Sequence, residues 1–169
     1  MRRLIPLIAL AGLVLAGTSV ALAGDGRLSP ELQAVRAAVA RFHSVDQALA
    51  AGYVPGSPCE ASPAGGMGFH YINPALFAPG VDPLQPEVLL YAPGADGSLK
   101  LVGVEYFAID ADQDLATSSD RPSLFGRGFD GPMPGHNPQM PVHYDLHVWV
   151  AEANPAGVFA PWNPAITCP

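Results

Sequence analysis

The chain has 169 residues, of which 15 are Asp or Glu and 8 are Lys or Arg, so its formal net charge is −7. This acidity, without any run of basic residues, argues against nucleic acid or an anionic membrane surface as a partner, because binding phosphates requires clustered Lys and Arg. The length suits a single domain once a targeting segment is set aside.

The first 23 residues have the pattern of a secretory signal peptide. Arg2 and Arg3 give a positive start, residues 4–20 are almost entirely apolar, and residues 21–23 read Ala-Leu-Ala, a small-x-small cleavage pattern. The apolar run is short for a membrane span and acidic sequence follows it, so we expect cleavage rather than a retained anchor. Loss of both arginines would change the charge from −7 to −9. Residues 24–169 would then form one secreted or periplasmic domain with no stable membrane span.

The start of this domain has the signals of two helices. Ser29 is a favourable N-cap and Pro30 suits the first helical position. The apolar residues that follow recur at helical spacing: Leu32, Val35, Val39 and Phe42. A second helical piece is expected between the cap Ser44 and the stop Gly52. Its predicted core-facing side chains are Val45, Leu49 and Tyr53.

After residue 52 proline and glycine become frequent and the apolar runs shorten to strand length. The predicted strands are 68–72, 88–91, 99–109 and 142–151. A Pro/Gly-rich loop, residues 110–141, separates the last two, and a loop of that length in a compact domain is usually functional. Helices first and strands later, without regular βαβ alternation, predict an α+β fold: an antiparallel β-sheet with the N-terminal helices packed on one face.

The two cysteines, Cys59 and Cys168, are predicted to form one disulfide, since an exported chain meets an oxidising compartment. The bond would close a loop of about 110 residues and hold the C-terminus, where the last residues of a domain usually fray. Two thiolate metal ligands are the alternative.

The last predicted strand has one apolar and one polar face, because side chains alternate along a strand. The apolar face consists of Val142, Tyr144, Leu146, Val148 and Val150. The other face would carry His143, Asp145, His147 and Trp149. Such a face is either exposed to solvent or lines a metal site or catalytic cleft.

Four residues are candidate ligands of a divalent metal ion: His70, Glu105, His143 and His147. Glu105 interrupts an otherwise apolar strand, and a buried carboxylate is costly unless it is paired or liganded. His143 and His147 lie about 13 Å apart in an ideal strand, so they share one ion only if the strand is bulged or strongly twisted. Imidazole with carboxylate suits Zn, Cu(II), Fe or Mn, and the lack of Cys and Met at these four positions argues against Cu(I).

Two further residues are candidates for catalysis. Asp145 can orient a liganding imidazole or move protons, and it is also a reserve metal ligand beside His143 or His147. His136 lies in the Pro/Gly-rich loop, which can place one side chain over a site. As an alternative, His136 is an ordinary exposed loop histidine. The chain has no G-x-S-x-G motif and no phosphate-binding glycine loop, so whether it is an enzyme stays open.

The segments GMGFHYINP, GPMPGHNP and HYDLHVW resemble those of a group of small secreted bacterial proteins, and the resemblance extends from Tyr53 to Cys168. The group has no established activity, so the resemblance implies an exported, bacterial context and assigns no residue a role. The preferred interpretation is an exported protein that binds a divalent metal ion and could be a metalloenzyme. The alternatives are a metal-free pocket for a small ligand and a structural or partner-binding envelope protein.

Overall fold

The structure is a computed structural model that describes residues 27–77, 80–136 and 138–169, so the predicted signal peptide lies outside the described residues. The helices are α1 (Pro30–Val39) and α2 (Val45–Ala50), with 3₁₀ turns η1 (Ala40–His43) and η2 (Pro74–Leu76). The strands are β1 (Val54–Pro55), β2 (Glu60–Ser62), β3 (Gly65–Ile72), β4 (Val88–Pro93), β5 (Leu99–Ile109), β6 (Ser123–Leu124), β7 (Arg127–Gly128), β8 (Asp130–Met133) and β9 (His143–Val148).

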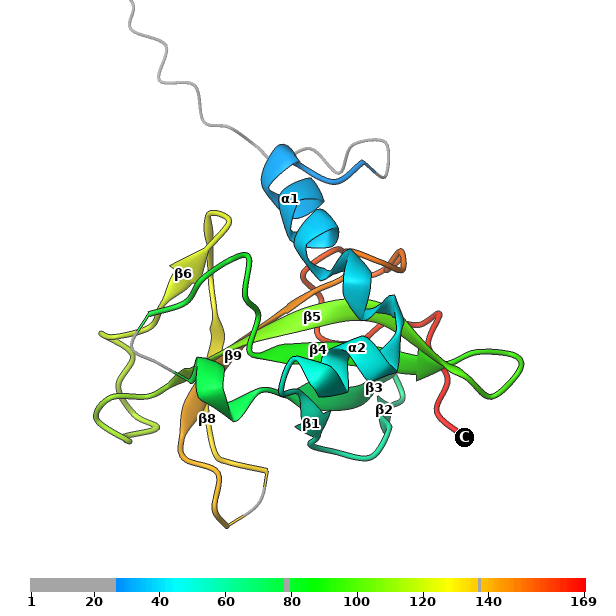
Figure 1. Cartoon of the computed structure of the whole chain (residues 1–169). Helices are drawn as coiled ribbons and strands as arrows, with labels where there is room; N and C mark the ends of the chain where they lie inside the picture. Colours follow the sequence, from blue (N-terminus) through cyan, green and yellow to red (C-terminus); the bar gives the residue numbers. More distant parts are fainter. Residues whose placement is uncertain (1–26, 78–79, 137) are drawn as a thin grey trace, which may run out of the picture.

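An antiparallel sheet dominates the described residues, as the sequence predicted (Figure 1). Neighbouring strands follow the order β1-β3-β4-β5-β9-β8, and β2 pairs with β3. Strands β6 and β7 form a separate hairpin. The central strands β3, β4, β5 and β9 therefore lie side by side although they come from distant parts of the chain.

The helices begin where the sequence predicted but do not bury every residue expected of them. Ser29 caps α1 by accepting a hydrogen bond from the backbone N–H of Leu32, and α2 ends before Gly52, whose φ is 94°. In α2, Ala48 is fully buried whereas Leu49 is 46% exposed, so the prediction for Leu49 is wrong. The 3₁₀ turn η1 separates the helices, so the apolar face of α1 does not continue in phase into α2.

The sheet has two buried faces. The face that α1 and α2 cover contains Leu89, Tyr91, Val104, Tyr106, Tyr144, Leu146, Val148 and Val150. The opposite face contains a second apolar cluster: Val88, Leu90, Ala92, Val102, Phe107, Trp149 and Ile166. The predicted alternation of β9 is therefore confirmed. All six residues of β9 are buried, so its polar face is not exposed to solvent.

Residues 110–141, predicted as one loop, are broken up by β6, β7 and β8. Strand β8 reads Asp-Gly-Pro-Met and pairs with β9 at the edge of the sheet. Glycine and proline disfavour a strand in sequence-based prediction, so this strand was not predicted. An edge strand nevertheless accommodates proline, because one side of it forms no hydrogen bonds with another strand.

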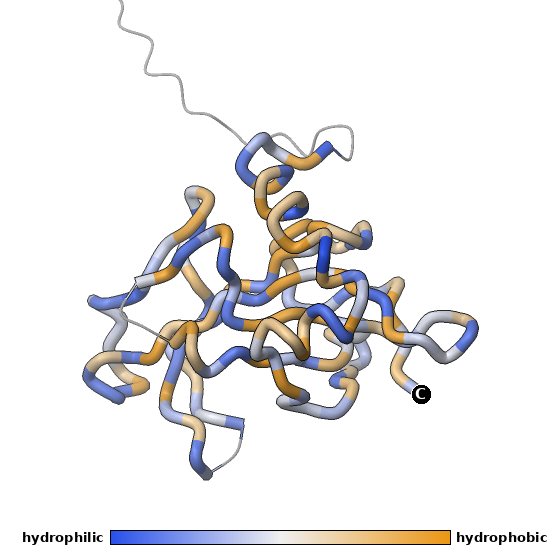
Figure 2. Tube along the Cα trace, in the orientation of Figure 1, coloured by the Kyte–Doolittle hydropathy of each residue, from blue (hydrophilic) through white to orange (hydrophobic). Residues whose placement is uncertain are grey.

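The predicted disulfide between Cys59 and Cys168 is present, with the two Cα atoms 5.6 Å apart. The C-terminal segment also pairs with β3 through an isolated bridge between Asn163 and Gly66. Figure 2 shows apolar stretches on α1 and the central strands, and hydrophilic stretches in several loops at the rim. Among the described residues, no helix has the length and apolar character needed to span a membrane.

Candidate metal centre

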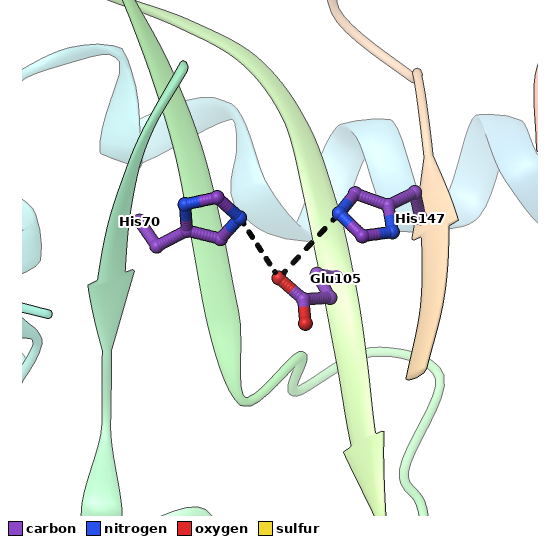
Figure 3. Close-up of side chains that lie close together, drawn as sticks. All are labelled: His70, Glu105 and His147. Atoms are coloured by element: carbon purple, nitrogen blue, oxygen red, sulfur yellow. Dashed lines mark ion pairs between the residues drawn. The ribbon is translucent and has the colours of Figure 1, made fainter. Parts of the chain in front are cut away.

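His70, Glu105 and His147 meet on the sheet face opposite the helices (Figure 3). They come from β3, β5 and β9, respectively. Glu105 lies directly opposite His147 in the pairing of β5 with β9, and His70 reaches toward Glu105 across β4. One ligand atom from each residue lies within 4.8 Å of the other two. The sheet thus joins three segments that are distant in sequence.

The spacing of the ligand atoms suits a single ion. Glu105 Oε2 lies 3.3 Å from His70 Nε2 and 3.7 Å from His147 Nε2. Ligands about 2.0–2.1 Å from a tetrahedral zinc ion are about 3.3–3.4 Å apart. The side chains of Glu105 and His147 are only 7% and 2% exposed, and that of His70 is 15% exposed. The three side chains therefore need only small shifts to share an ion.

Three buried polar atoms of Glu105 and His147 lack hydrogen bonds within the described residues. Glu105 Oε2 and both ring nitrogens of His147 are inaccessible to solvent and have no hydrogen-bond partner among the described residues. Buried polar atoms are normally hydrogen-bonded, because leaving one unpaired costs roughly 1–3 kcal/mol. A cation bound between the three residues would satisfy the lone pairs that the protein leaves without a donor.

Ser57 orients His70. The Ser57 hydroxyl donates a hydrogen bond to the carbonyl of Pro58 at 2.9 Å, so its oxygen is left to accept one from His70 Nδ1–H, also at 2.9 Å. This places the ring proton on Nδ1 and the lone pair on Nε2, which faces Glu105. His70 is thereby held in the form in which a histidine binds metal through Nε2.

Asp145 lies beside the corresponding nitrogen of His147, but farther away. Its Oδ1 lies 3.7 Å from His147 Nδ1, which is longer than a hydrogen bond, and the residue is buried. A carboxylate beside the outer nitrogen of a liganding histidine fixes the ring and makes the ligand more basic. Asp145 therefore supports the group from outside instead of joining it.

Burial and neighbouring charges set the protonation of the three residues. Burial, assisted by His147, lowers the pKa of His70 to about 3. Burial raises the pKa of Glu105 to about 7 against the opposing attraction of His147. Burial alone would lower the pKa of His147, but the carboxylates of Glu105 and Asp145 raise it overall. Near neutral pH the His70 ring is neutral, and a metal ion bound by the three residues would displace the proton held between Glu105 and His147.

His143, the fourth predicted ligand, is not part of this group. It is fully buried, its ring stacks on Phe107 with centroids 4.7 Å apart, and the exposed His136 meets it edge to face at 5.4 Å. The two histidines of β9 therefore contact different residues, His147 the group with Glu105 and His143 the rings of Phe107 and His136. This agrees with their separation of about 13 Å in an ideal strand.

Two polar residues near the site escaped the sequence analysis. Ser57 lies in a Gly-Ser-Pro-Cys turn, and nothing local to that turn indicates a distant histidine. Glu87 immediately precedes β4, is 2% exposed and accepts a hydrogen bond from the backbone N–H of Phe107. Burial raises the pKa of Glu87 to about 7. Its position directly before an apolar strand could have indicated a buried acid. Glu87 holds β5 through the hydrogen bond to Phe107 and is not one of the three clustered residues His70, Glu105 and His147.

Two hollows, of about 340 and 280 Å³, lie elsewhere on the protein, and neither is lined by His70, Glu105 or His147. They therefore give no support to a metal-free ligand pocket at the histidines. Comparisons of the chain with protein-family models, with curated proteins and with solved structures gave no match. The arrangement of His70, Glu105 and His147 is accordingly what points to a function.

Proposed function

We propose that the protein is an exported metal-binding protein in which His70, Glu105 and His147 hold one divalent transition metal ion. The observation that carries the proposal is the convergence of three ligand atoms within 4.8 Å, of which Glu105 Oε2 and His147 Nε2 are buried and have no hydrogen-bond partner among the described residues. Ser57 and Asp145, which lie beside the outer nitrogens of the two histidines, support it further.

The donor set narrows the choice of ion. Two imidazoles and one carboxylate are the ligands of many catalytic zinc sites, and they are also the facial set of non-haem Fe(II) sites. Cu(II) and Mn remain compatible with these ligands but are less characteristic of them. Three protein ligands leave a coordination position open, where a bound ion supplies Lewis-acid chemistry. Asp145 could then hold or move a proton at His147 Nδ1.

Export is supported by the signal-peptide pattern of residues 1–23, the disulfide and the resemblance to small secreted bacterial proteins. A disulfide persists in the periplasm or outside the cell, whereas it is rare in the cytosol. An exported chain would take its ion from that compartment, where no reducing thiol pool competes for it.

Metal reconstitution tests the proposal. Protein made without a His-tag is stripped with a chelator, and Zn(II), Fe(II) under argon, Mn(II) and Cu(II) are each added and the excess removed. We expect one ion per chain in the wild type, measured by elemental analysis. Replacing Glu105→Gln should lower the affinity by more than the roughly 10–100-fold that loss of an outer partner costs, since it removes a ligand.

Glu152→Gln is the matched control, because Glu152 pairs with Lys100 away from the histidines. A second ligand substitution, His147→Gln, should likewise lower the affinity, and His43→Gln on η1 is its matched control. Substoichiometric binding of all four metals, or equal binding by the wild type and Glu105→Gln, would contradict the proposal.

A further inference from the structure

His143 carries an unexplained lone pair. Its Nδ1 lies 3.1 Å from the carbonyl oxygen of Pro141, and a carbonyl only accepts hydrogen bonds, so the ring proton is on Nδ1. The lone pair is then on Nε2, which is buried and has no hydrogen-bond partner in the part of the chain that the structure describes. The whole residue is 0% exposed. A histidine whose Nδ1–H is held by a backbone carbonyl, with Nε2 facing inward, has the orientation of a metal ligand.

A second imidazole, that of His136, lies next to the His143 ring. His136, in the connection between β8 and β9, approaches His143 edge to face with ring centroids 5.4 Å apart. Phe107 stacks on the His143 ring at 4.7 Å and an interplanar angle of 22°. One face of the His143 ring is thus covered by an apolar wall, and the second histidine comes from a different segment.

Two methionines complete the surroundings. The backbone N–H of His136 donates to Met140 Sδ at 3.4 Å, and Met140 packs against the apolar cluster that includes Phe107. Met133 on β8 is the register partner of His143, so their side chains leave the sheet on the same face. Only four methionines occur in the chain, and these two alternate with the histidines in the spacing Met-x2-His-x3-Met-x2-His over residues 133–143.

We propose that His136, His143, Met133 and Met140 form a second metal site, which binds Cu(I). Thioether sulfur is a soft donor that selects Cu(I), and imidazole also suits copper. The site made by His70, Glu105 and His147 has a carboxylate and no sulfur, so the two sites differ in the ions they take. Both cysteines are tied up in the disulfide, so neither thiol competes for the ion. This inference does not depend on the proposed function.

A competition titration tests it on the folded chain with its disulfide intact. Copper is kept as Cu(I) with ascorbate, which spares the disulfide, and the protein competes for it with a coloured Cu(I) chelator; Ag(I) serves as a redox-inert probe. We expect one Cu(I) per chain and sulfur bound to copper in X-ray absorption spectra. Met140→Leu and His136→Gln, in the connection between β8 and β9, should each lower the affinity at least tenfold.

The controls match these substitutions one for one. Met67→Leu changes a methionine on β3, and His43→Gln changes an exposed histidine, so neither should alter Cu(I) affinity. Glu105→Gln should lower divalent-metal binding and leave Cu(I) binding intact. Unchanged Cu(I) affinity in both Met140→Leu and His136→Gln, or loss of Cu(I) in Glu105→Gln, would overturn the second site. Failure of Zn(II), Fe(II), Mn(II) and Cu(II) to bind the wild type would instead sink the first.

Discussion

The three buried or half-buried histidines of the sheet share one feature, an oxygen next to Nδ1. The oxygen belongs to the Ser57 hydroxyl for His70, to the Pro141 carbonyl for His143 and to the Asp145 carboxylate for His147, at 2.9, 3.1 and 3.7 Å. The hydrogen bonds at His70 and His143 leave the lone pair of each ring on Nε2, whereas the Asp145 carboxylate lies beyond hydrogen-bond distance of His147. A hydroxyl and a backbone carbonyl thus give His70 and His143 the same tautomer, in which a histidine can bind metal through Nε2.

The pH dependence of stability in the metal-free protein reports on Glu105. Its pKa rises from 4.5 to about 7 on folding because the carboxylate is buried, so the folded state binds more protons between these values. The free energy of unfolding therefore falls as the pH rises through this window. His70 acts in the opposite sense: its pKa falls from 6.5 to about 3, so stability rises with pH between about 3 and 6.5.

Glu105→Gln removes the titration of Glu105, so comparison with the wild type isolates its contribution to the free energy of unfolding. We expect the free energy of unfolding of Glu105→Gln, relative to wild type, to increase by roughly 1–3 kcal/mol between pH 5 and pH 8, measured by urea unfolding with a chelator present. Glu152→Gln, changed at the surface, should show a difference that is the same at both pH values. A pH-independent difference for Glu105→Gln would mean that the buried carboxylate is not the source.

At the scale of elements, the sequence predicted β5 over its full length and the two faces of β9, because each depends on local periodicity. It could not predict that Glu105 would face His147 and not His143, since this follows from the pairing of β5 with β9. The route of β4 between β3 and β5, which sets how far His70 must reach, is likewise a long-range property. Strand β8 was not predicted because Gly131 and Pro132 are residues that strands generally disfavour.

Gly103, in the middle of β5 and two residues before Glu105, lies where β9 closely approaches β5. A Cβ atom there would lie 2.9 Å from the carbonyl oxygen of Val148 and 3.4 Å from Leu90 Cδ1. Gly103→Ala therefore forces β9 away from β5, and overpacking of this kind costs about 1–3 kcal/mol. We expect that loss in urea unfolding, together with weaker divalent-metal binding, because His147 lies on β9.

The matched control for this substitution is Gly128→Ala on β7, where the nearest atom to an added Cβ is Arg121 Cδ at an ordinary 3.5 Å. It should leave both stability and metal binding nearly unchanged. If Gly103→Ala were as mild as Gly128→Ala, the close approach of β9 to β5 would not constrain His147.

For the whole molecule, the disulfide and the sheet stabilise the fold in different ways. The Cys59–Cys168 bond joins the segment before β2 to the C-terminal segment, which also lies over the sheet through Ile166. Two backbone hydrogen bonds between Asn163 and Gly66, at 3.0 and 3.1 Å, tie the same segment to β3 independently of the disulfide. The C-terminal segment therefore has attachments that survive when the disulfide is absent.

The double substitution Cys59→Ser and Cys168→Ser should lower the stability of the fold without changing divalent-metal binding. Closing a loop of about 110 residues stabilises a chain by at most roughly 4–5 kcal/mol through the entropy of the unfolded state, so we expect a loss up to that size in urea unfolding. None of His70, Glu105 and His147 lies on the C-terminal segment, and the sheet that brings them together keeps its own hydrogen bonds. Divalent metal bound per folded chain should consequently match the wild type in native conditions. A variant that stays folded but loses its metal would show that the disulfide, and not the sheet, holds the three ligands together.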